Sequence, residues 1–310
     1  MFRYLRVNVL GAMSTRSDGP DASLASELPE GAVRRSPLVL TLRSGPVLTA
    51  LIILALIVLS AAGANLLGLA DPLAINPADR LKGFSSAHWF GTDVYGRDVF
   101  SRVIYGARLS LIIGAGAALA AVALGLLVGL IAGYFRAADM VIMRIMDGIM
   151  SIPSILLAIA LISVTGASLV TVLLAITMPE FPRVVRLVRS IILSVRTEPH
   201  VEAAISLGTR TPMLLVRHMV PSTVAPLIVQ GTFIFASAIL SEAILSFLGV
   251  GMPPEFPSWG NIMAEGRIYF QLKPELILLP GTFVALAVLS VNLMGDAMRD
   301  ALDPKMARQV

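Results

Sequence analysis

Residues 109–135 read LSLIIGAGAALAAVALGLLVGLIAGYF, a run of 27 residues without Asp, Glu, Lys or Arg. A helix of ~20 apolar residues crosses the hydrocarbon core of a bilayer, which is about 30 Å thick. Four other stretches are equally free of charge: 46–70, 148–179, 221–241 and 276–295. Over the whole chain 56% of residues are hydrophobic and 14% are charged, whereas soluble domains carry about 25% charged residues. The pattern predicts an all-α polytopic membrane protein and excludes a soluble or disordered chain.

The stretch 148–179 is too long for a single helix. Its 32 residues would extend about 48 Å as one helix, well beyond the hydrocarbon thickness. Thr165-Gly166-Ala167-Ser168, near its middle, has the composition of a turn. We therefore expect two helices here, at about 142–164 and 169–188, and six transmembrane helices in the chain.

The distribution of positive charge orients these six helices. With the N-terminus in the cytoplasm, 17 of the 24 Lys and Arg residues fall on the cytoplasmic side, as the positive-inside rule requires. The first outer loop departs from the rule, and we expect its four aspartates to offset its five basic residues locally. The basic residues are Arg80, Lys82, Arg97, Arg102 and Arg108, and the aspartates are Asp71, Asp79, Asp93 and Asp98. Both termini are predicted to be cytoplasmic.

Motifs for catalysis and nucleotide binding are missing from the sequence. The chain has no Cys, no Gly-Lys pair, no His-Glu-x-x-His and no Gly-x-Ser-x-Gly. We therefore expect no catalytic residues, no cofactor, no metal site and no enzyme activity in this chain. The first apolar run begins too late for a secretory signal peptide, and the start codon remains open between Met1 and Met13.

A loop of about 30 residues between the fourth and fifth predicted helices is far longer than a tight turn. Its central part reads EPHVEAAISLG over 198–208. Pro199 suits the first turn of a helix, the glutamates suit its positive end, and Gly208 suits a left-handed stop. Thr211 and Pro212 fit the N-cap and first residue of a second helix. Such a helix either docks into a groove on a soluble partner or is a solvated connector.

This loop resembles the EAA loop of bacterial ABC importer permeases. Glu202-Ala203-Ala204 is followed after three residues by Gly208 and after nine more by His218-Met219-Val220-Pro221. The family pattern ends in Ile-x-Leu-Pro, so His218 and Val220 depart from it. Four further segments resemble the C-type permease of the dipeptide/oligopeptide/nickel family: HWFGTD at 88–93 with GRD at 96–98 and YGAR at 105–108; Met143-Arg144 with Asp147 and Pro153; LSFLG at 245–249 with Pro253-Pro254 and Trp259-Gly260; and Asn292-Leu293 with Gly295-Asp296 and RDALDP at 299–304.

The resemblance implies an importer of short peptides in the bacterial inner membrane. Its parts would be a heterodimer of two homologous permease chains, two cytoplasmic ABC ATPases that hydrolyse ATP, and an extracytoplasmic substrate-binding protein. The ATPase-coupling loop would use Glu202, Ala203, Ala204, Gly208 and Pro221. Nickel, glutathione or an opine are alternative cargoes, and an ion-coupled secondary transporter is the alternative from another class.

The same resemblance divides the chain into four parts. Residues 1–45 are a cytoplasmic, largely disordered tail, and 46–107 hold the first transmembrane helix and an outer loop. Residues 108–299 are a type-1 ABC transmembrane permease domain, with the EAA loop at about 196–221. Residues 300–310 are a cytoplasmic C-terminal tail.

Six features of the spans and outer loops are further candidates. Glu242 and Glu180 lie in spans, where a charge is expensive, so each lines the translocation path or makes a structural or inter-subunit contact. Trp89 and Trp259 either sit at the membrane interface or contact the binding protein. Gly125, Gly129 and Gly133 form a small-residue stripe, which we expect to pack inside the bundle rather than against a second permease. Asp147 is expected to pair with Arg144 on the same helix face.

Overall fold

The structure is a computed structural model that describes residues 44–302, all within one compact unit. The calls on the two tails, on the tail arginines and on the start codon lie outside these residues. The described part is helical, and its strand pairing is limited to an isolated bridge between Thr92 and Asp98. The elements are α2 (Gly45–Ala62), η1 (Pro77–Asp79), α3 (Val99–Tyr134), α4 (Arg136–Met150), α5 (Ser154–Thr165), α6 (Leu169–Val195), α7 (Pro199–Ser206), α8 (Thr211–Leu214), the π-helical turn η2 (Leu215–Met219), α9 (Val220–Phe247), α10 (Trp259–Gly266), η3 (Arg267–Tyr269) and α11 (Glu275–Leu302).

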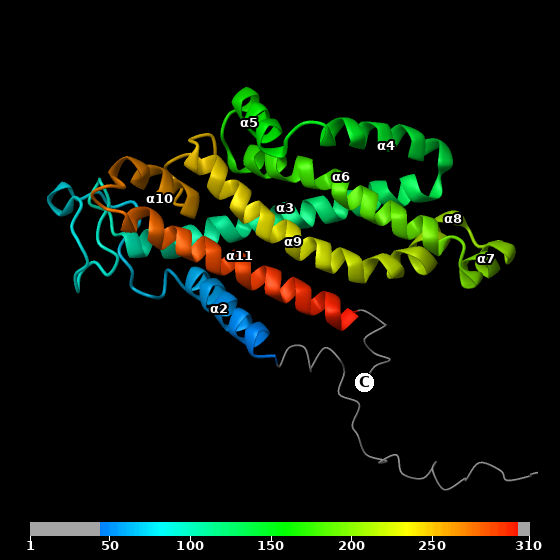
Figure 1. Ribbon diagram of the computed structural model, residues 1–310, viewed down its shortest axis with the longest axis horizontal. Helices are drawn as coiled ribbons and strands as arrows, with labels where there is room; N and C mark the ends of the chain where they lie inside the picture. The colour runs from blue at the N-terminus through cyan, green and yellow to red at the C-terminus, as the bar shows by residue number, and fades with distance from the viewer. Residues whose placement is uncertain (1–43, 303–310) are drawn as a thin grey trace, which may run out of the picture. The chain divides into compact units, whose positions relative to one another are not determined.

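The long helices run alternately in opposite directions through one bundle (Figure 1). We call the end that carries α7 and α8 the inner end, and the end that carries α10 the outer end. Four segments are long and apolar enough to cross a membrane: α2, α3, the stretch from α8 through α9, and α11. The α4–α5 pair is a fifth if it is one span. The prediction of an all-α membrane protein is confirmed, and the number of six spans stays a prediction.

The prediction of one continuous helix over 142–164 is wrong. The segment is divided into α4 and α5, which meet at a bend of 88°. Pro153 explains the break, because it cannot donate a backbone hydrogen bond and its ring clashes with the preceding helical turn. The fourth predicted helix is confirmed in place as α6, which continues to Val195.

The glycine stripe of α3 packs against α6, as predicted for a contact inside the bundle. A Cβ atom added to Gly125 or Gly129 would lie 2.5 or 2.6 Å from the Cβ atom of Val184 or Val188. Gly133 faces Ile192 in the same way, at 2.7 Å. Since real Cβ atoms do not approach so closely, only glycine allows α3 and α6 to lie at this separation.

Three of the five basic residues of the first outer loop, Lys82, Arg97 and Arg102, bind its aspartates as expected, whereas Arg80 and Arg108 bind other groups. Arg97 and Arg102 are buried and share Asp93, with Arg97 Nε and Arg102 Nη1 each 2.6 Å from its Oδ2 atom. Both arginines also bind Glu265 of α10. These charges therefore tie the outer loop to α10, and their pairing neutralises positive charge at the outer end of the bundle.

The acidic residues of α4 bind arginines of α6. Asp139 pairs with Arg189, and Asp147 pairs with Arg186. The predicted Asp147–Arg144 pair is therefore wrong, because a neighbouring helix supplies the partner. Two ion pairs spaced along α4 hold this helix beside α6.

Candidate functional site

Three adjoining hollows follow one side of α9 from the inner to the outer end. The inner one has a volume of about 590 Å³ and lies among α6, α9 and the end of α11. The middle one, about 330 Å³, shares Gln230 and Phe233 with it. The outer one, about 200 Å³, shares Glu180, Arg183 and Ser237 with the middle one and reaches α5. We call this series the α9 groove.

The α9 groove has polar and charged side chains in its lining, among apolar ones. Each of α6, α9 and α11 contributes polar or charged side chains. They are Glu180 and Arg183 from α6, Ser222, Gln230, Ser237 and Ser241 from α9, and Asn292 and Arg299 from α11. Ionisable side chains within a membrane are costly and usually mark a substrate path. The groove is therefore the part of the bundle suited to a polar cargo.

Glu180 and Arg183 form an ion pair where the middle and outer hollows meet. Arg183 Nη1 lies 2.7 Å from Glu180 Oε1, and the Ser237 hydroxyl donates to the same oxygen at 3.1 Å. The Glu180 side chain is 9% exposed, whereas that of Arg183 is 52% exposed. Glu180 therefore has its ion-pair partner on its own helix, one turn along.

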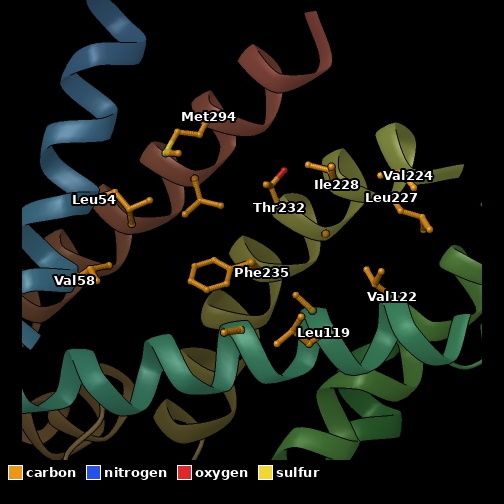
Figure 2. Close-up of a pocket in the computed structure, with 14 residues that line it drawn as sticks. Leu54, Val58, Leu119, Val122, Val224, Leu227, Ile228, Thr232, Phe235 and Met294 are labelled. Atoms are coloured by element: carbon orange, nitrogen blue, oxygen red, sulfur yellow. The ribbon is translucent and has the colours of Figure 1, made fainter. Parts of the chain in front are cut away.

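The opposite side of α9 is apolar. A cavity of about 660 Å³ lies among α2, α3, α9 and α11 (Figure 2). Thr232 is the polar residue in its lining, and its hydroxyl donates to the Val229 carbonyl at 2.7 Å. This cavity offers no group for recognising a polar cargo, so the candidate path is the α9 groove.

The loop at the inner end has the predicted form. α7 is a short helix, Gly208 adopts φ = 75°, and α8 begins at Thr211. The N-cap of α8 is Arg210 rather than Thr211, which corrects that detail. Pro221 lies in the first turn of α9, where its missing N–H costs nothing.

α7 has one buried side and one exposed side. Val201 and Ala204 pack into the core with Ile192 and Val195 of α6. Glu202, Ala203, Ile205 and Leu207 are exposed, Leu207 to 87%. We call these four residues the α7 face. An exposed apolar surface of this kind is typical of a docking site. The buried side of α7 packs against α6.

Glu242 lies outside the α9 groove. It is fully buried, and it accepts hydrogen bonds from the hydroxyls of Ser246 and Ser258 at 2.8 Å each. The Ser110 hydroxyl lies 3.5 Å from its second oxygen. These contacts join α3, α9 and the N-cap of α10, so a structural role within the chain fits Glu242 better than the path.

The two candidate tryptophans differ in exposure. Trp89 is 64% exposed, with its ring 5.1 Å from that of Phe100. Trp259 is fully buried, and its indole N–H donates to the Val103 carbonyl at 3.0 Å. The prediction that Trp259 contacts a binding protein is therefore wrong for this conformation, because its side chain is buried at the outer end of the bundle.

Sequence reasoning missed Gln230, Ser237, Asn292 and Arg299 as groove residues. One signal was available, since Gln230, Ser237 and Ser241 are spaced by seven and four residues and so share a helix face. The polar residues of α11 carried no comparable signal, because their position beside α9 depends on the tertiary fold.

The structure is a helical membrane bundle with a groove along α9 that carries polar side chains and a short, partly exposed helix at its inner end, an arrangement that suits a transport permease. The sequence matches the family described as "Binding-protein-dependent transport system inner membrane component" over residues 121–308. The chain belongs to this family, and it is a multi-pass inner-membrane transport component.

Several relatives carry more specific names. The chain is 52% identical over 239 residues to a probable peptide ABC transporter permease protein, y4tQ, of Sinorhizobium fredii, covering 77% of this chain and 82% of the relative. It is 45% identical over 257 residues to the dipeptide transport system permease protein DppC of Alkalihalophilus pseudofirmus, covering 83% and 84%. It is 40% identical over 230 residues to the glutathione transport system permease protein GsiD of Pectobacterium atrosepticum, covering 74% and 76%.

Proposed function

We propose that this chain is the permease subunit of an ATP-driven, binding-protein-dependent importer of short peptides. The observation that carries the proposal is the α9 groove, whose lining places Glu180, Arg183 and several polar side chains along α9 between the inner and outer ends. Relatives named for peptide and dipeptide transport support the choice of cargo. Cargo would move inward by alternating access, with ATP hydrolysed on separate subunits.

A second, homologous permease chain would complete the path. The α9 groove is lined on one side by this chain, and residues along it such as Ser222, Arg183 and Leu240 are exposed. A facing chain would cover these side chains and enclose the cargo between two grooves. The polar and apolar side chains of both subunits would then determine which cargo can pass through the path.

The α7 face would dock on a cytoplasmic ABC ATPase. Ala203 allows close approach, Ile205 and Leu207 supply apolar contact, and Gly208 sets the corner after the helix. Ala204 would act from the buried side, because it packs with Val201 against α6. When the ATPase pair closes, α7 would move with it and push on α6. Since α6 forms one wall of the α9 groove, that wall would move as well. This orientation requires the inner end, and hence both termini, to be cytoplasmic.

An extracytoplasmic binding protein would deliver cargo at the outer end. Trp89 is the exposed aromatic candidate for that contact. Uptake by a Trp89→Ala importer, measured across a range of binding-protein concentrations, is expected to need more binding protein for half-maximal rate. An unchanged concentration dependence would assign Trp89 to the membrane interface.

Gly208→Glu tests the coupling role. A side chain at Gly208 meets no atom within 4 Å, so the variant is expected to insert and assemble while placing a charge beside the α7 face. Gly68→Glu is the matched control, because Gly68 has φ = 63°, also meets no atom within 4 Å, and lies in the outer loop. In proteoliposomes that hold the complete importer, Gly208→Glu should lose uptake and cargo-stimulated ATPase activity, and Gly68→Glu should keep both. Normal uptake by Gly208→Glu would contradict the proposal.

Reconstitution of this chain alone separates the importer from an ion-coupled secondary transporter. The chain is expected to be inert without its ATPases, whereas a secondary transporter would take up cargo along an ion gradient. Glutathione, the cargo in the name of one relative, is the second candidate. Competition between labelled dipeptide and unlabelled glutathione, nickel or opine in the complete importer identifies the preferred cargo.

A further inference from the structure

Arg183 is an accessible cation at the centre of the α9 groove, and Arg299 is a second one in the inner hollow. The Arg183 side chain is half exposed, and it lines both the middle and the outer hollow. Within residues 44–302 its recorded hydrogen bond runs from Nη1 to Glu180. A guanidinium has more N–H donors than one carboxylate oxygen uses, and its planar fork matches a second carboxylate. Arg183 can therefore bind another carboxylate without leaving Glu180.

Glu180 holds the Arg183 guanidinium in place, and its own side chain is too buried to bind cargo. Its side chain is nearly buried, and one of its oxygens holds both Arg183 of α6 and Ser237 of α9. Pro179 and Pro182 flank it, and neither can donate to the carbonyl four residues earlier. Glu180 therefore fixes the position of Arg183 on α6, while Ser237 ties Glu180 to α9.

The charges of the groove favour an anionic group. Among the described residues that line its three hollows, the charged ones are Glu180, Arg183 and Arg299. Arg183 and Glu180 balance each other at the junction of the middle and outer hollows, and Arg299 in the inner hollow gives the groove a net positive charge. The Arg183 side chain stands where the middle and outer hollows meet, so cargo that follows the groove passes it.

We propose that Arg183 binds the carboxylate end of the cargo as it passes through the groove, and that Glu180 is the residue that positions Arg183. This inference rests on the proposed importer function. A charge-assisted, bidentate bond to the carboxylate would favour peptides with a free carboxyl terminus over the same peptides as amides. Selection would then occur in the permease as well as in the binding protein.

The test compares maximal uptake rates for a dipeptide and its carboxyl-terminal amide. The complete importer is reconstituted in proteoliposomes, and each peptide is supplied at a concentration that saturates the binding protein in a separate titration. The wild type is expected to prefer the free acid by at least about tenfold, the effect of one charge-assisted hydrogen bond. Arg183→Gln should reduce this ratio to near one, and Arg183→Lys should retain most of it. Glu180→Gln should lower the ratio less than Arg183→Gln does.

Arg186→Gln is the matched control, because Arg186 lies one turn further along α6 and pairs with Asp147 of α4. It should keep the wild-type ratio. If Arg183→Gln slows both peptides equally and leaves the ratio unchanged, Arg183 is structural and the inference is wrong. If the wild-type importer takes up neither peptide, the proposed function fails instead.

Discussion

Gly129→Ala should loosen the contact between α3 and α6. The new Cβ would lie 2.6 Å from Val188 Cβ, 2.9 Å from Val188 Cγ1 and 3.0 Å from the Val185 carbonyl oxygen. Because ordinary contacts between carbon atoms are about 3.5–4.0 Å, the helices must separate locally by about 1 Å. Overpacking of this kind costs about 1–3 kcal/mol, and each kcal/mol lowers the unfolding midpoint by roughly 2–4 °C in a domain of this size class.

The assay is thermal unfolding of the purified importer complex in lipid nanodiscs. The fraction that stays folded at each temperature is measured by size-exclusion chromatography. Gly148→Ala is the control, because Gly148 lies in α4 and a Cβ there meets nothing within 4 Å. Helix propensity alone favours alanine at both positions. The two variants should therefore shift the midpoint in opposite directions.

A second substitution at Val188 identifies the contact. Truncation to Ala keeps the Cβ atom that makes the closest approach, so Gly129→Ala/Val188→Ala should stay destabilised. Val188→Gly removes that atom, and Gly129→Ala/Val188→Gly should recover stability relative to the sum of the single effects. Equal midpoints for Gly129→Ala and Gly148→Ala would refute this explanation of the glycine stripe.

Three further outcomes are expected. Trp259→Phe should cost about 1–3 kcal/mol, since it removes a buried indole and its bond to the Val103 carbonyl; the same thermal assay measures it. Asp139→Asn should destabilise the α4–α6 contact by a similar amount, about 1–3 kcal/mol, and exchange of the charges of Asp139 and Arg189 should recover part of that loss. The hydrogen bond from Lys82 lowers the pKa of Asp79 below its usual value of 3.8, so this pair stabilises the folded outer loop above that pH and ceases to do so as the pH falls through the lowered pKa; protease sensitivity of the loop against pH should show the transition in the wild type and lose it in Asp79→Asn.

Local signals in the sequence were enough for the elements that depend on local chemistry. Uncharged runs place the spanning helices, and Pro199 and Gly208 set the start and the corner of the α7 region. The spacing of Gly125, Gly129 and Gly133 predicts a close helix contact. Each of these follows from backbone geometry or helix periodicity, which a single chain segment already contains.

Contacts between distant segments were not predictable in the same way. Asp147 has Arg144 nearby in sequence, yet it binds Arg186, because α4 lies beside α6. Trp259 follows a proline-rich outer segment that suggests exposure, yet it is buried beneath α3. The α9 groove combines residues of α6, α9 and α11, and their meeting is a property of the bundle. Pro153 is a local signal within 142–164, and the break between α4 and α5 falls beside it.

Cross-linking from Leu207 tests whether the α7 face docks on an ATPase. The chain has no cysteine, so Leu207→Cys can be labelled at one site with a maleimide photo-cross-linker in the assembled importer. Leu66→Cys is the control, because Leu66 is 91% exposed and lies in the turn after α2. The account predicts a covalent product between Leu207→Cys and the ATPase and none from Leu66→Cys. A labelled Leu207→Cys that forms no ATPase product in an importer active in uptake would contradict it.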